Sequence, residues 1–247
     1  MEGMLKLYSP INELKQIGED IWIVDGNEIH MSFKLFKVPF TTRMTIVKID
    51  NNKLWIHSPI AFNKELDDKI KELGEIEHII APNKYHYSYV LDWYNHYPDA
   101  KVWLAKGVST KLKIDERENF VSLDNISKTS WSEEIYFTPF RGSIAMEEMV
   151  FFHKKSSTLI LTDLIESIEV NKLPLLYKPV FKFGDNKYPK FRTSRDLRSS
   201  FIFKKQAKDS YSKIESWKPD KIVFSHGKII LENGTEKLKE AFYWLRK

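Results

Sequence analysis

The sequence predicts an α/β protein in which two β-sheets pack face to face and helices cover their outer sides. Three observations lead to this prediction. Each half of the 247-residue chain is rich in short strand-like runs, each half ends in a helical segment, and no Gly-x-Gly-x-x-Gly follows a strand. The missing glycine motif argues against a doubly wound nucleotide fold. A chain of this length can bury one large core, so we expect a single domain over residues 1–247.

The first half begins with strands. The run DIWIVDG (20–26) alternates as a half-buried strand does. The run RMTIVKIDNNKLWIHSPI (43–60) predicts a hairpin, because the Asp-Asn-Asn at its centre tolerates turn conformations. Further along, EHIIAP (77–82) and KVWLA (101–105) are short and apolar, as buried strands are, and a helix is expected between them at 86–97.

The first helix is expected at residues 63–76, where start and stop signals both occur. Asn63 is a favourable N-cap residue, and Gly74 is a typical helix stop. The apolar side chains between them recur at helical spacing: Leu66, Ile70 and Leu73. This pattern predicts one apolar face that packs on a sheet.

The second half repeats the order of strands followed by helices. Three consecutive strands are predicted at 134–140, 148–154 and 157–163, and a tight turn at Lys155-Ser156 joins the last two. A basic, irregular region with two helices follows at about 165–216. The strand KIVFS (221–225) and an amphipathic helix (235–246) come last.

Composition excludes several classes of site. Hydrophobic residues make up 42% of the chain, which predicts a packed core rather than disorder. There is no cysteine, so any metal must be held by histidine, carboxylate or water. The net charge is +5, and the basic residues are interleaved with acidic ones along the chain, so no nucleic-acid partner is expected. A basic stretch with aromatic residues (189–208) keeps nucleic-acid binding as an alternative. No apolar run forms a signal peptide or a membrane span, which favours a cytoplasmic protein that contacts no membrane.

Three polar residues follow apolar strands and form the candidate site. His86 comes shortly after the strand HIIAP, Asp163 ends TLILTD, and His226 ends KIVFSH. Strand ends that project into one crevice are where layered α/β folds usually place their chemistry. Two histidines and a carboxylate are a common ligand set for Zn, Fe or Mn. The alternative is a purely structural role, in which Asp163 is a turn or cap residue and His226 is a turn residue before glycine.

The order of these motifs resembles the metallo-β-lactamase superfamily over most of the chain, and in particular a degenerate branch catalogued as a domain of unknown function. The Asp-Thr-Gly strand end of the superfamily corresponds to LWIHSP, with Ser58 at or near the aspartate. The Gly-Asp that carries the bridging carboxylate corresponds to Thr162-Asp163. The final His-Gly corresponds to His226-Gly227, preceded by W-x-P-D-x-I-V. The resemblance implies a four-layer αββα sandwich with a site at one edge of the sheets.

The chain departs from the superfamily at its main signature, H-x-H-x-D-H, where it reads PNKYHYSYVLDW. If His86 matches the last histidine, the earlier ligand positions hold Ala81, Asn83 and Tyr85; a shift of one residue would place His86 on the signature's aspartate instead. Arg141 stands at the histidine of the Thr-Pro-Gly-His segment. The resemblance therefore implies that one of the two metal sites is lost and that three of the four ligands of the other are kept.

Two functions remain open. The first is a metal-dependent hydrolase that acts on a small ester, amide or phosphoester. It would hold one divalent ion (Zn, Fe or Mn) on His86, Asp163 and His226, with His86 and Asp163 as the catalytic groups. The residues expected around the ion or facing the substrate are Ser58, Asn83, Tyr85 and Arg141. The second is a metal-free, non-catalytic protein that binds a small anion through Arg141 and Lys84, with the Arg141 guanidinium paired to Asp163. The sequence leaves the oligomeric state open.

Overall fold

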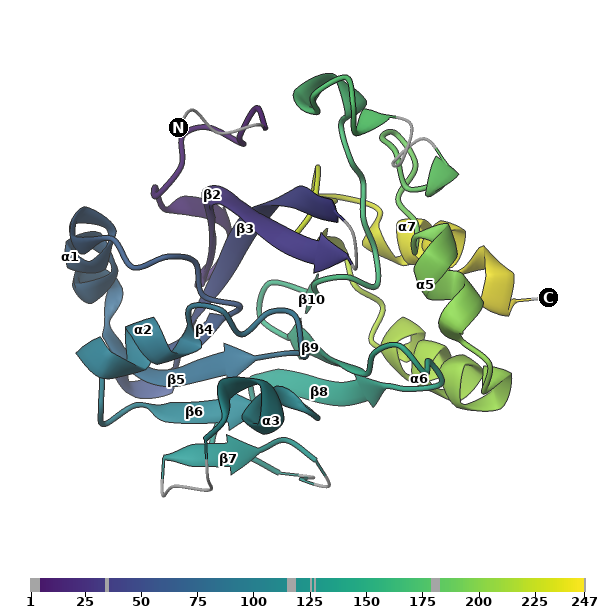
Figure 1. The fold of residues 1–247 in the computed structure, drawn as a ribbon. Helices are drawn as coiled ribbons and strands as arrows, with labels where there is room; N and C mark the ends of the chain where they lie inside the picture. Colours follow the sequence, from purple (N-terminus) through teal and green to yellow (C-terminus); the bar gives the residue numbers. More distant parts are fainter. Residues whose placement is uncertain are drawn as a thin grey trace.

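A computed structural model describes residues 5–33, 36–114, 119–124, 126, 128–178 and 183–246. Two sheets lie face to face, with helices α1 to α3 on one outer side and α5 to α7 on the other (Figure 1). The predicted αββα architecture is therefore confirmed.

The larger sheet has seven strands in chain order, with β1 to β4 antiparallel and β4 to β7 parallel. Its strands are β1 (Lys15–Gly18), β2 (Ile21–Phe33), β3 (Phe36–Ile49), β4 (Lys53–His57), β5 (Glu75–Ala81), β6 (Lys101–Leu104) and β7 (Phe120–Ser122). The helices that follow its strands are α1 (Lys64–Leu73), α2 (Val90–His96) and α3 (Val108–Leu112). Helix α2 packs on β5.

The smaller sheet has four strands in the order β11-β10-β9-β8, and β11 is parallel to β10. Its strands are β8 (Ile135–Phe140), β9 (Glu148–His153), β10 (Thr158–Ile160) and β11 (Lys221–Val223). The helices on its outer face are α5 (Arg195–Ser200), α6 (Lys204–Ser216) and α7 (Gly234–Ala241). Helix α6 packs on β8, and α7 packs on β11.

Strand β9 shows why the smaller sheet is buried on both faces. Its residues are all buried, and they alternate between two apolar clusters. Phe151 points between the sheets, where its ring lies 5.0 Å from that of Trp55 on β4. Val150 and Phe152 join the outer cluster, which includes residues of α6 and α7. A continuous apolar run is what a strand covered on both faces requires.

Most predicted elements are present, with shifted ends. Helix α1 has Asn63 as its N-cap, whose side chain accepts the Leu66 amide at 2.9 Å. Gly74 follows the helix, and a Cβ there would lie 2.2 Å from the Asn52 carbonyl oxygen, so the position needs glycine. The predicted helix at 86–97 begins only at Val90, because the preceding residues form a turn that belongs to the site.

The largest difference from the sequence prediction is the β2–β3 hairpin. These strands pair from Ile21↔Val47 to Phe33↔Phe36, well beyond the predicted strand at 20–26. The register shifts between Asp25 and Glu28, so the period of two breaks at a bulge and the second half of the hairpin is hidden in the sequence pattern. The short strands β1 and β7 were also not predicted.

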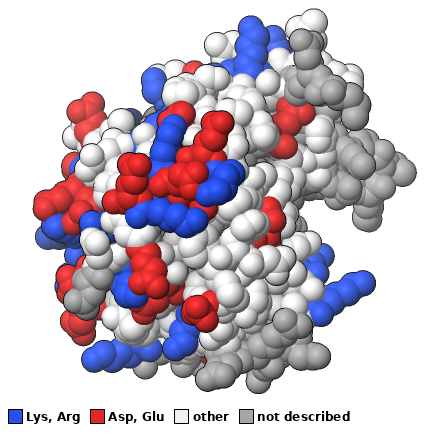
Figure 2. Space-filling model, turned by 90° about the vertical axis from the view of Figure 1, so that its left-hand side faces the viewer, with Lys and Arg blue, Asp and Glu red and all other residues white. Residues whose placement is uncertain are grey.

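The surface carries mixed charge. On the face shown in Figure 2, Lys and Arg side chains are interleaved with Asp and Glu. Within the described ranges, no helix is long and apolar enough to cross a membrane.

Candidate metal centre

Three segments from different parts of the chain bring one ligand atom each to a single point. His86 follows β5, Asp163 follows β10, and His226 follows β11. The Nε2 atoms of His86 and His226 lie 3.0 and 3.2 Å from Asp163 Oδ1. The three ligand atoms all lie within 4.8 Å of one another. The three residues predicted as metal ligands therefore converge, and the turn-residue interpretation does not account for this convergence.

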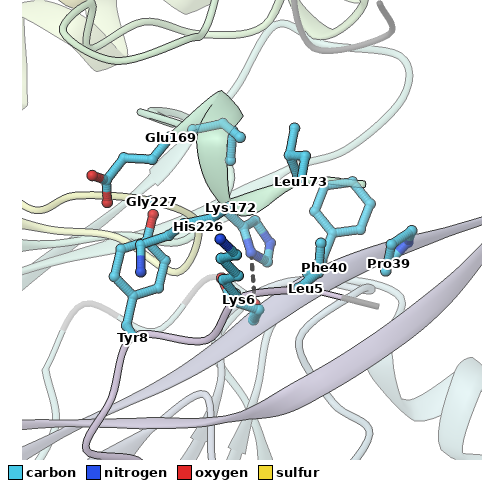
Figure 3. A pocket seen from close by; sticks show the side chains of 12 residues that line it. Leu5, Lys6, Tyr8, Pro39, Phe40, Glu169, Lys172, Leu173, His226 and Gly227 are labelled. Atoms are coloured by element: carbon cyan, nitrogen blue, oxygen red, sulfur yellow. Dashed lines mark hydrogen bonds between the residues drawn. The ribbon is translucent and has the colours of Figure 1, made fainter. Parts of the chain in front are cut away.

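The ring of His226 is held from behind by strand β3. Its Nδ1 donates to the Thr41 carbonyl oxygen at 2.9 Å, the contact drawn as a dashed line in Figure 3. With Nδ1 directed to this carbonyl, Nε2 is the ring nitrogen that faces Asp163, where it can hydrogen-bond or ligate. Gly227, with φ of +104°, follows in a conformation that favours glycine, and a Cβ there would lie 2.1 Å from the Ser167 carbonyl oxygen.

The Arg43 side chain hydrogen-bonds to the backbone on both sides of His226. Its buried guanidinium donates through one nitrogen to the carbonyl oxygens of Phe224 and Gly227, at 2.6 and 3.0 Å. The other guanidinium nitrogens contact Asp25 Oδ1, at 2.7 and 2.8 Å. Because the two carbonyls flank His226, this buried side chain fixes where the loop after β11 leaves the sheet.

His86 is oriented by a turn that starts at Asn83. The Asn83 Oδ1 atom accepts the backbone amides of Tyr85 and His86, at 2.8 and 3.0 Å, as in an Asx turn. The His86 Nδ1 atom lies 2.7 Å from Ser58 Oγ. Ser58 follows β4 with φ of +51°, an uncommon conformation for serine, and it is buried. The Ser58 hydroxyl therefore contacts one ring nitrogen of His86, and Asp163 contacts the other.

Asp163 sits on a buried polar network. Its Oδ2 atom accepts from Asn83 Nδ2 at 2.9 Å, and its backbone amide donates to Glu148 Oε2 at 2.9 Å. The Glu148 carboxylate also accepts the amide and hydroxyl of Thr162, both at 2.7 Å. Glu148 is fully buried at the start of β9. Its hydrogen bonds to Thr162 and Asp163 hold the segment that follows β10 in place.

Charges inside this network shift the protonation of its members. Burial alone would raise the pKa of Asp163, but the imidazoles of His86 and His226 hold it well below its usual range. Burial opposes a charge on His86, yet the Asp163 carboxylate raises the pKa of that imidazole. Burial, reinforced by Asp163, raises the pKa of Glu148 to about 7. The centre therefore keeps an ionised carboxylate between two imidazoles at neutral pH.

Two cavities adjoin the centre, and both are lined by Tyr85 and His226. The first, of about 330 Å³, also has Lys84, Lys111 and Ser58 in its wall, and we call it the basic cavity. The second, of about 180 Å³, has Glu166 and Asp196 in its wall; it is the acidic cavity. Burial raises the pKa of Glu166 to about 7, although nearby His226 opposes the shift.

A third, much smaller cavity also has His226 in its wall. Figure 3 shows it between the N-terminal segment and residues 168–173, with Leu5, Phe40 and Leu173 in its wall. Its volume of about 20 Å³ holds about one water molecule, so it has no room for a substrate. Ligand access to the centre is therefore through the basic and acidic cavities.

Not every residue expected near the centre lies there. Ser58 and Tyr85 line the basic cavity, and Tyr85 is 39% exposed at the rim. Asn83 is fully buried, so it holds Asp163 and the His86 turn rather than facing a substrate. Arg141 lies elsewhere: it pairs with Glu147 at 3.5 Å and lines a separate cavity beside α6.

The position of Arg141 bears on the metal-free alternative. Within the described ranges, Arg141 forms no ion pair with Asp163, and it shares no cavity with Lys84. The reason is local. The chain from Arg141 onward turns toward α6, where its backbone amide donates to Ser210 Oγ. The two histidines take the place beside Asp163 that the guanidinium was expected to fill.

Several residues of the centre were not predicted: Thr41, Arg43, Glu148 and Glu166. Arg43 and Glu148 gave a signal, because each is a charged residue directly before a mainly apolar run, at 44–47 and 149–152. Thr41 acts through its backbone, which no side-chain pattern can reveal. Glu166 lies in an irregular segment without periodicity.

Comparisons with known proteins agree with this fold. A metallo-β-lactamase named DIM-1 superposes with a TM-score of 0.61 at 12% identity, covering 97% of this chain and 100% of that one. Metallo-β-lactamases from Erythrobacter litoralis and Pontibacter korlensis give TM-scores of 0.60 and 0.58 at 10% and 11% identity. The first covers 94% of this chain and 95% of that one, and the second covers 98% and 100%. Identities this low show the fold alone.

Among curated proteins, no relative matches the chain. The family model described as "Domain of unknown function (DUF4336)" matches residues 19–201, a span that includes His86 and Asp163 but ends before His226. Since this match covers most of the chain, the protein belongs to the DUF4336 family, and it has the metallo-β-lactamase fold.

Proposed function

We propose that this protein is a metal-dependent hydrolase with a single divalent ion on His86, Asp163 and His226. The observation that carries the proposal is the convergence of two imidazole nitrogens and one carboxylate oxygen within 4.8 Å. Zn, Fe and Mn all suit this ligand set. The proposed substrate is a small ester, amide or phosphoester.

The donor chemistry of the site fits such an ion. Each histidine engages its Nδ1 elsewhere, His226 with the Thr41 carbonyl and His86 with Ser58, so both Nε2 atoms face the same carboxylate. Metal-ligating histidines are commonly oriented in this way by a partner on the second ring nitrogen. The Asn83 amide does the same for Asp163.

The chain's own residues would divide the work of hydrolysis. A divalent ion at this centre supplies Lewis acidity, which polarises a carbonyl or phosphoryl oxygen and makes water more acidic. Asp163 stays ionised near neutral pH, because the two imidazoles hold its pKa below the usual range, so its carboxylate would be ready to hold the ion. His86 would hold the ion through Nε2, and Ser58 at its Nδ1 keeps the ring in that orientation. Tyr85 at the rim would limit the width of the substrate.

Elemental analysis of protein purified without a chelator tests the proposal. We expect about one equivalent of Zn, Fe or Mn per chain, and we expect a chelator to lower the melting temperature reversibly. Asp163→Asn and His226→Ala should lose the ion. His96→Ala, which changes an exposed histidine on α2, is the matched control and should keep it.

Two outcomes would contradict the proposal. One is less than about a tenth of an equivalent of any of the three metals, unchanged by metal soaking. The other is an ion content that Asp163→Asn and His226→Ala leave unaltered.

A further inference from the structure

The two cavities that open on the metal centre carry opposite charge. The cationic side chains of the basic cavity are Lys84 and Lys111, and no carboxylate among the described residues lines it. The acidic cavity is lined by Glu166 and Asp196 in addition to Asp163, and no lysine or arginine of the described ranges lines it. A molecule that reaches from one cavity to the other therefore passes from a positive to a negative environment.

The charged groups at both ends are available to a ligand. Within the described ranges, neither lysine forms an ion pair, and Lys84 Nζ lies over the Tyr85 ring at 5.5 Å. Asp196 lies exposed in the first turn of α5, and it forms no ion pair with another described residue. Glu166 is buried and accepts a hydrogen bond from the neutral amide of Asn186, so its carboxylate could also pair with a protonated amine in the cavity.

The two cavities meet at the metal centre. Tyr85 and His226 line both of them, while His86 lines the basic cavity and Asp163 lines the acidic one. The centroids of the His86 and His226 rings are 5.3 Å apart, so the two side chains lie together where the linings overlap. A ligand that spans both cavities must place its middle over the atoms that would hold the ion.

We propose that the ligand of this protein is a small bipolar molecule, with an anionic group bound by Lys84 and Lys111 and a protonated amine bound by Glu166 and Asp196. Charge complementarity over the two ends would select this class against molecules that carry only one of the charges. That the bond to be cleaved lies in the middle of the molecule rests on the proposed hydrolytic function. The binding of the two charged ends does not.

A charge-deletion series measures this directly by calorimetry on chelator-treated protein. The probes are triglycine, its N-acetyl form, its C-terminal amide and the doubly blocked form, and O-phosphoethanolamine with its N-acetyl form tests phosphate as the anion. We expect each block to weaken binding about three- to tenfold, as loss of a partly exposed ion pair does. If only the phosphoethanolamine pair responds, the anion is a phosphate.

Variants assign each end to its cavity. In the Lys84→Met/Lys111→Met protein, amidation of triglycine should no longer weaken binding, whereas N-acetylation still should. The Glu166→Gln/Asp196→Asn protein should show the reverse. Lys106→Met and Asp99→Asn change exposed residues outside both cavities and should behave as the unmodified protein does.

The proposal is overturned if blocking the amine leaves affinity unchanged in both the triglycine and the phosphoethanolamine series, if both double variants weaken all probes equally, or if neither series binds at about 10 mM. These measurements are independent of the ion, because the protein is treated with a chelator. Elemental analysis can therefore contradict the metal proposal while calorimetry supports the bipolar ligand, and calorimetry can contradict the ligand while the metal is present.

Discussion

Replacing Arg43 with methionine should lower the stability of the protein and weaken ion binding at the metal centre, although Arg43 is not a ligand. Methionine keeps much of the volume but removes the charge, so Asp25 loses its buried partner and the carbonyls of Phe224 and Gly227 lose their donor. Breaking one side of a buried ion pair typically costs 3–5 kcal/mol. Lys15, with Nζ 2.8 Å from Asp25 Oδ2, still offsets part of the charge, so we expect a loss of about 3 kcal/mol in the free energy of unfolding.

Urea unfolding measures this loss, and a second variant separates its causes. Adding Asp25→Asn to Arg43→Met removes the unpaired charge, so the double variant should regain about 1–2 kcal/mol. Both should bind the proposed ion about 10- to 100-fold more weakly, because the loop that carries His226 is no longer clasped. Arg141→Met is the matched control: its side chain is half exposed, and we expect a change of at most about 0.5 kcal/mol.

The reasoning would be refuted if Arg43→Met lowered stability no more than Arg141→Met does. It would also fail if the double variant were less stable than the single one, since the cost could not then come from the unpaired Asp25.

Three further predictions concern acid stability and local geometry. Burial lowers the pKa of His57 from 6.5 to about 3, so the unfolded chain binds this proton more readily and stability is lost as the pH falls below 6.5. Between pH 7.5 and pH 5, the free energy of unfolding of His57→Phe should therefore fall by about 2 kcal/mol less than that of the unmodified protein, as measured by urea unfolding at both pH values. Asn83→Ala should cost about 1–3 kcal/mol and lower the ion content, because it removes the Asn83 hydrogen bonds to Asp163 Oδ2 and to two backbone amides; unchanged thermal unfolding and elemental analysis would count against this. Gly227→Ala should be far more destabilising than Gly107→Ala in thermal unfolding. Both have positive φ, but only at Gly227 would a Cβ meet a carbonyl oxygen, and equal effects would contradict the clash.

The layers of the fold could be predicted because local patterns encode them. The centre of strand β9, residues 149–152, is apolar because helices and the other sheet cover its two faces, and helix α1 has both of its end signals, Asn63 and Gly74. The far half of the β2–β3 hairpin could not be predicted, because a bulge near Gly26 interrupts its alternation.

The ligand trio was accessible to sequence reasoning for a related reason. Each of its members follows an apolar strand, where the chain leaves the sheets toward a common edge. What surrounds the trio was less accessible. Arg141 was expected beside Asp163 from its position along the chain, but side-chain direction depends on the turn after β8, which carries Arg141 toward α6. Whether the whole chain forms one domain stays a prediction.

The hydrogen bond from His226 to Thr41 joins residues 185 positions apart. Contacts between such distant segments close late in folding, because the entropy of the intervening chain must be lost first. The centre should therefore be absent from the folding transition state and complete only in the native protein. An ion that binds there would leave the refolding rate unchanged and slow unfolding instead, so it would lengthen the lifetime of the folded chain without helping the chain to fold.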